Sequence, residues 1–201
     1  MHNVRRVQSV FALAAEVVIV TVLGLAGCQS FAGRSGTERL DSSTGMTIGV
    51  ANQTMVFART EARYSRSTRD YAYLAPVETN RQGLREYFLW VGIATTLDRG
   101  YLAPEMDLPT SLQVILQGEP MVFDLQPWSE SVPGPTAASV YRPPVALRGQ
   151  LGARVTRDQL RLLAEGAPAS IRVGSSDGRT RVYEIWDEEP VNWSALLGAA
   201  N

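Results

Sequence analysis

Carboxylates are the only side chains in this sequence that could supply acid-base catalysis. All 19 basic residues are arginine, and the chain has one histidine, His2, and one cysteine, Cys28. Beyond its first residues the chain therefore lacks the base of a serine triad and the partners for Ser-Lys, Cys-His or Schiff-base chemistry. Glycoside hydrolysis needs only two carboxyl groups, about 5 to 9.5 Å apart. The candidates for that pair are Glu61, Glu78, Glu86, Asp124 and Glu184.

Two further patterns have simpler explanations than catalysis or metal binding. Gly174-Ser-Ser-Asp-Gly178 fits the G-x-S-x-G nucleophile motif, but that motif needs a helix after it, and the following residues are typical of a strand. The segment is therefore predicted to be a hairpin turn. Asp187-Glu188-Glu189 lacks the spaced ligands of a calcium loop and is predicted to be a solvated turn. No catalytic residue, metal ligand or cofactor is assigned.

Arginines and tyrosines gather in one early part of the expected domain. Arginine forks and tyrosine rings suit the recognition of phosphates or sugars. A charged strand face that protects a sheet edge is the competing explanation. Trp128 lies in a proline-rich stretch and is expected to be exposed, whereas Trp90, Trp186 and Trp193 are expected to lie in the core or to cap it. The candidate ligand or partner contacts are Arg59, Arg63, Arg66, Arg69, Tyr71, Tyr73 and Trp128.

The chain begins with the layout of a secretory signal peptide. Arg5 and Arg6 precede an apolar run over 17–26, and small residues lead to Cys28. A run of this length covers roughly 15 Å as a helix, about half of a membrane's hydrocarbon core. The residues Leu25-Ala26-Gly27-Cys28 resemble the lipobox of bacterial lipoproteins. Two alternatives stay open: an ordinary cleaved signal peptide with an incidental cysteine, and an uncleaved anchor.

The resemblance implies that residues 1–27 are a signal peptide and that Cys28 becomes an acylated N-terminus. Several acyl chains, at ~0.8 kcal/mol per buried methylene, suffice for stable anchoring. Gln29 stands where aspartate favours inner-membrane retention in enteric bacteria, so by analogy we expect an outer-membrane lipoprotein facing the periplasm. Residues 28–46 are rich in Ser, Thr and Gly and are predicted to be a flexible tether.

Residues 47–201 are predicted to form a single β-rich domain. Strands are expected over 53–64, 71–77, 85–94, 112–116, 121–125, 145–155, 170–173 and 179–186. The strand at 85–94 is apolar on both faces and should be central. Along the strand at 53–64, Val56 and Ala58 are assigned to the apolar face and Phe57 to the charged one.

The same domain contains a helix signal and a proline-rich stretch. Thr156 and Gln159 form a capping box, and Gly166 with Pro168 ends the helix that it starts. Residues 191–197 fit a second, C-terminal helix, and 127–144 should lack regular structure. The predicted fold is mainly β: an antiparallel β-sandwich, or a partly open barrel, with one short helix and this terminal one.

Charge and composition narrow the expected function. The net charge of -1 offers no basic surface for nucleic acid. The domain looks similar to uncharacterised β-rich lipoproteins of Gram-negative bacteria, without pointing to a named family. We expect a membrane-anchored protein that binds an envelope protein or glycan without catalysis, or that assists envelope assembly or secretion. The alternative is a carboxylate-dependent glycan hydrolase.

Overall fold

The computed structural model describes residues 36–42, 44–61, 66–96, 108–131 and 140–198, and Arg34–Asn201 forms one compact unit. The predicted signal peptide over residues 1–27 and the predicted lipidation site Cys28 lie outside the described residues. The strands are β1 (Gly36–Asp41), β2 (Met46–Ala51), β3 (Met55–Thr60), β4 (Arg69–Arg81), β5 (Leu84–Thr95), β6 (Pro109–Leu116), β7 (Glu119–Asp124), β8 (Gln126–Pro127), β9 (Leu147–Val155), β10 (Ser170–Ser175) and β11 (Thr180–Ile185). The helices are α2 (Trp128–Ser131), α3 (Arg157–Gly166) and α4 (Ser194–Leu197).

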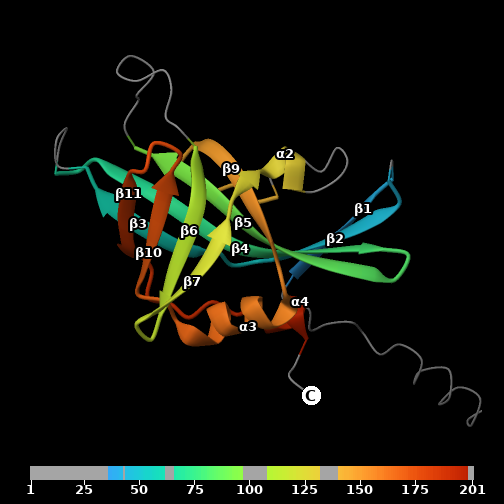
Figure 1. The fold of residues 1–201 in the computed structure, drawn as a ribbon. Coiled ribbons are helices and arrows are strands. Elements are labelled where there is room, and N and C mark those ends of the chain that lie inside the picture. The colour runs from blue at the N-terminus through green and yellow to red at the C-terminus, as the bar shows by residue number, and fades with distance from the viewer. Residues whose placement is uncertain (1–35, 43, 62–65, 97–107, 132–139, 199–201) are drawn as a thin grey trace, which may run out of the picture. The chain divides into compact units, whose positions relative to one another are not determined.

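The strands form one antiparallel sheet that nearly closes on itself (Figure 1). Its order is β7-β6-β10-β11-β3-β4-β5-β9-β8. The two strands at the ends of this path, β7 and β8, are consecutive in the chain and separated by Leu125 alone. The Leu125 amide donates a hydrogen bond of 2.9 Å to the Thr110 carbonyl, which keeps this segment beside β6. The predicted mainly β, antiparallel fold is confirmed, in its barrel-like form.

Strands β1 and β2 extend the sheet from the distal half of β4. The first half of β4 pairs with β3, from Arg69 to Leu74, and its later residues Val77–Asn80 pair with β2. Strand β1 pairs along its whole length with β2. Residues 36–41, predicted to be flexible tether, are therefore a strand. The hydrophobic pattern gave no signal because β1 is an edge strand whose side chains are largely exposed and which main-chain hydrogen bonds hold in place.

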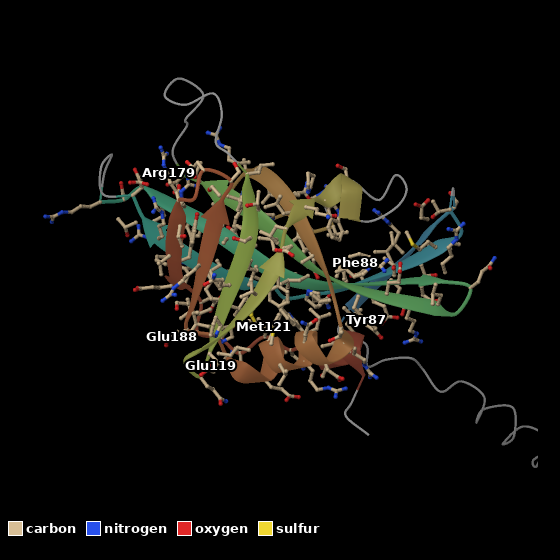
Figure 2. All side chains as sticks on the ribbon, viewed as in Figure 1. Tyr87, Phe88, Glu119, Met121, Arg179 and Glu188 are labelled. Atoms are coloured by element: carbon tan, nitrogen blue, oxygen red, sulfur yellow. The ribbon has the colours of Figure 1, made fainter. Side chains whose placement is uncertain are left out.

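The two faces of β4 and β5 belong to different hydrophobic cores. The inner core contains Phe57, Leu74, Leu89, Leu112, Leu160 and Trp193 among others, and the outer core contains Met46, Ile48, Tyr73, Val77, Phe88, Trp90 and Trp128. Tyr87 packs against the inner core, whereas its neighbour Phe88 belongs to the outer one (Figure 2). The prediction that the strand at 85–94 is central is confirmed: it is buried on both faces and flanked by β4 and β9.

Helix α3 lies across one end of the sheet (Figure 1). The predicted capping box is present, because the Gln159 amide donates to Thr156 Oγ1 at 3.1 Å and the Thr156 amide donates to Gln159 Oε1 at 2.8 Å. Leu160 and Leu163 are fully buried in the inner core. The C-terminal helix expected over 191–197 is the short α4. The proline-rich stretch also contains a short helix, α2, which sequence patterning missed.

Three side chains differ from the prediction in whether they are buried or exposed. Phe57, assigned to the charged face of its strand, is completely buried in the inner core. Trp128, expected to be exposed, is 2% exposed and packs edge-on against Phe88 at 6.3 Å between ring centroids. Trp186, expected in or capping the core, is 53% exposed. Helix α2 folds Trp128 back over the outer core, so a loop-like sequence did not leave its aromatic residue in solvent.

We expect Trp128→Ala to lower the free energy of unfolding by about 3 to 5 kcal/mol, because it removes a large buried ring. Trp186→Ala should cost about 1 kcal/mol or less, because half of this ring is already in water. Urea denaturation of the two variants tests the difference. Equal losses would contradict the assignment of Trp128 to the core.

Candidate functional site

A cavity of about 770 Å³ lies on the outer face of β3, β4 and β5. We call it the aromatic groove and define it by five aromatic residues, two arginines and three small polar residues. These are Tyr71, Tyr73, Trp90, Tyr141 and Trp186, then Arg39 and Arg142, then Thr37, Asn52 and Thr54. Aromatic walls with a few polar groups are typical of ligand-binding pockets.

Strand alternation positions the aromatic residues on one side of the groove. Tyr71 and Tyr73 are two residues apart on β4 and point outward, with ring centroids 6.2 Å apart and an interplanar angle of 27°. Trp186 directly follows β11, and its amide donates a 2.8 Å hydrogen bond to the Val56 carbonyl on β3. Its ring therefore meets the Tyr71 ring edge-on, at 6.0 Å between centroids.

The other side of the groove comes from residues 140–145 of the proline-rich stretch. The Tyr141 ring lies against Trp90, with 5.0 Å between ring centroids, and its hydroxyl donates to the Pro76 carbonyl at 3.1 Å. Trp90 is in turn held by a 3.2 Å hydrogen bond from Nε1 to Gln150 Oε1 on β9. A segment without regular structure is thus fixed by one side chain with both apolar and polar contacts.

Burial changes the acidity of two groove tyrosines. The pKa of Tyr141 is raised well above its usual value by burial, against a smaller opposing effect of a backbone hydrogen bond at Ala51. The pKa of Tyr73 is raised by burial and by the neighbouring Tyr71 phenol. Both residues are therefore neutral hydrogen-bonding groups at physiological pH.

The charged side chains of the groove are all basic. Arg39 on β1 and Arg142 in the 140–145 segment line it, and no aspartate or glutamate is among its described lining residues. Both arginines are exposed. Neither forms an ion pair with another residue in the part of the chain that the structure describes. The rim of the groove therefore carries two positive charges that no described acidic residue pairs with.

Trp186 also links the groove to a neighbouring cavity of about 640 Å³. Arg69 lines this second cavity, and its guanidinium lies 4.8 Å from the centre of the Trp186 ring. A cation over an indole face is a favourable arrangement that restrains both side chains. Glu184 is the one acidic residue among those lining this cavity.

The structure brings together three of the seven predicted contact residues: Arg69, Tyr71 and Tyr73 share the outer face of β4. Arg59 stands at an inner-face position of β3 and forms ion pairs with the buried carboxylates Glu61 and Asp70, and it also lines the second cavity with Arg69 and Trp186. The other three predicted contacts do not join this group. Arg63 lies outside the described residues, Arg66 is exposed away from the described cavities, and Trp128 is buried.

The five candidate acids are distributed over separate parts of the fold. Glu78 forms an ion pair with Arg85 at 3.3 Å, and Glu86 forms one with Arg154. In the pairing of β4 with β5, Glu78 stands opposite Tyr87 and Glu86 stands opposite Thr79. The two glutamates therefore lie on opposite faces of this hairpin. The remaining three are Glu61, Asp124 and Glu184. None of the described cavities is lined by two of these five acids.

Sequence reasoning missed several groove residues. For Trp186 a signal existed, since it alternates with the buried Tyr183 and the partly buried Ile185 in the same way as the exposed Val182 and Glu184 do. For Arg39, Tyr141 and Arg142 there was none, because an edge strand and a proline-rich segment lack a hydrophobic period. These residues meet only through the tertiary fold.

The groove tyrosines make stability depend on alkaline pH. Unfolding returns Tyr141 and Tyr73 to a pKa near 10, so above about pH 10 the unfolded chain loses protons that the folded one keeps. The contribution of these two tyrosines to the free energy of unfolding should therefore be constant below pH 9 and fall above pH 10. Tyr141→Phe should reduce that slope in urea denaturation series. The chain has no lysine to obscure the effect, and an unchanged slope would contradict it.

Comparison with protein-family models, curated proteins and solved structures gives no match for this chain. Among the described residues, no helix is both long and apolar enough to cross a membrane. Within them there is also no group of three or more histidine, cysteine, aspartate or glutamate side chains that could hold a metal ion.

Proposed function

We propose that this chain is a lipid-anchored protein of the bacterial cell envelope that binds an envelope component in the aromatic groove. The observation that carries the binding role is the groove itself. Aromatic residues and two arginines that form no ion pair with a described residue converge there from β1, β4, β5, the residue after β11 and the 140–145 segment. Segments that are distant in sequence supply one concave surface. Such convergence is a feature of binding sites.

The binding role is proposed as non-enzymatic. The groove's described lining contains two arginines as its only charged groups, and arginine does not release its proton in proteins. Its buried tyrosines have raised pKa values and so are poor proton donors and acceptors near neutral pH. The hydrolase alternative requires two facing carboxylates, and the five candidates do not share a described cavity.

The anchoring role rests on the lipobox-like residues that end at Cys28. The eight peptide units between Cys28 and Gly36 can span at most about 30 Å when fully extended. An acylated Cys28 would hold Gly36, the first residue of β1, within that distance of the membrane. In this proposal the protein is placed at the inner leaflet of the outer membrane and binds material in the adjoining periplasm.

The anchor is tested by intact-mass measurement of the full chain purified from a Gram-negative host. We expect the loss of residues 1–27 and the gain of acyl groups, together with partition into the detergent phase. Cys28→Ser should remain uncleaved and unacylated, because the thiol receives the diacylglyceryl group. A wild-type chain that keeps residues 1–27, or that is cleaved without acylation, would contradict the anchor.

The binding role is tested by retention of the full chain, in detergent, on immobilised protein, lipid and glycan fractions of the envelope. We expect retention on one fraction, at least tenfold weaker in Trp186→Ala because the exposed ring faces the groove. Leu162→Ala is the matched control, since this side chain is also 53% exposed but lies on α3. Retention on none of the three, or equal retention of both variants, would contradict binding at this site.

A further inference from the structure

The charge of the aromatic groove points to the class of ligand. The chain as a whole has a net charge of -1, yet the described groove lining contains Arg39 and Arg142 and no acid. We propose that the groove binds a saccharide that carries carboxylate groups, an acidic glycan of the envelope. This inference rests on the proposed binding function and adds the chemistry of the ligand.

The aromatic residues provide surfaces for sugar rings. Trp186 is 53% exposed and Tyr71 is partly buried, so both present ring area to the cavity, while Tyr73 and Trp90 are buried beneath them. The face of an aromatic ring is negative and attracts the slightly positive C–H groups on one side of a sugar ring. The arrangement on β4 and after β11 therefore provides a platform whose rings are held by neighbouring rings.

The rim provides polar groups that suit hydroxyls. Thr37 and Asn52 are exposed on the rim, and Thr37 Oγ1 donates to Asn52 Oδ1 at 3.4 Å. Thr54 adds a third hydrogen-bonding side chain. A sugar hydroxyl can exchange places with water at such groups, because each donates and accepts hydrogen bonds.

The arginines select for negative charge. A guanidinium binds a carboxylate through two parallel hydrogen bonds, which gives both direction and strength. Arg39 and Arg142 reach the groove from different segments and make no ion pair with a described residue, so a ligand carboxylate need not displace an internal partner. A neutral sugar would use the rings and leave both charges without a partner.

An extended peptide fits this surface less well than a glycan. Peptides commonly bind a sheet by pairing with a free strand edge. The strands beneath the aromatic rings have no such edge, since β3 pairs with β11 and β4, and β5 pairs with β4 and β9. The free edge of β1 lies at the rim, where Thr37 and Arg39 line the groove. At the rings, side chains alone must hold the ligand, and rings with hydroxyl-bearing neighbours match a saccharide.

The test uses the full chain in detergent and three probes. The first is an oligosaccharide of alternating N-acetylglucosamine and its lactyl ether, which carries carboxylates; the second is an N-acetylglucosamine oligomer of equal length. The third is vesicles of phosphatidylglycerol and phosphatidylcholine. Binding is measured by calorimetry and by the emission of the exposed Trp186. We expect the acidic oligosaccharide to bind at least tenfold more tightly than the neutral one, and this preference to shrink as salt is raised.

The double variant Arg39→Gln, Arg142→Gln should remove that tenfold preference, because its affinity for the acidic oligosaccharide should fall to its affinity for the neutral one. Arg172→Gln is the matched control, since this exposed arginine of β10 lines none of the described cavities. In the control the preference for the acidic oligosaccharide should persist.

Three results would overturn the inference, and they can be told apart from failure of the binding role. Equal affinity for acidic and neutral oligosaccharides, lost in Trp186→Ala, would leave glycan binding intact but remove the charge selection. Binding to anionic vesicles that needs Arg39 and Arg142, without saccharide binding, would assign the groove to lipid. Retention on the envelope protein fraction alone would assign it to a peptide or protein. Retention on no envelope fraction would instead contradict the proposed function itself.

Discussion

The pairing of β4 with β5 is the interaction on which the rest of this structure depends. Twelve residue pairs run from Asp70–Thr95 to Arg81–Leu84, and most of these positions are buried. Because side chains alternate along a strand, this one hairpin supplies a face to the inner core and a face to the outer core. The barrel-like sheet forms around the first face, and the aromatic groove lies on the second.

The length of β4 also decides where the groove can be. Its first half is held by β3 and its second half by β2, which in turn carries β1. Arg39 therefore stands beside tyrosines that are more than thirty residues away in the chain. The 140–145 segment joins them because Tyr141 combines an aromatic contact with Trp90 and a hydrogen bond to Pro76. The site is a consequence of the extended hairpin.

Some arginine side chains stabilise the fold, and others are exposed at the groove. Arg59 forms ion pairs with both Glu61 and Asp70, two carboxylates that are 6% and 2% exposed. Removing the partner of such a buried charge is costly. Arg69 is restrained over the Trp186 ring. Arg39 and Arg142 have no such structural duty among the described residues. These four arginines therefore have three different roles, and neither the composition nor the net charge of the chain distinguishes between the roles.

The sequence by itself determined the fold class, the central strand at 85–94 and the capped helix, because these depend on hydrophobic period and on short-range hydrogen bonds. It also limited the chemistry, since a chain without lysine and with its one histidine at position 2 has few catalytic groups. It could not place Trp128 inside the protein or find β1. Those outcomes depend on which surface the rest of the chain covers, and only the tertiary structure decided that.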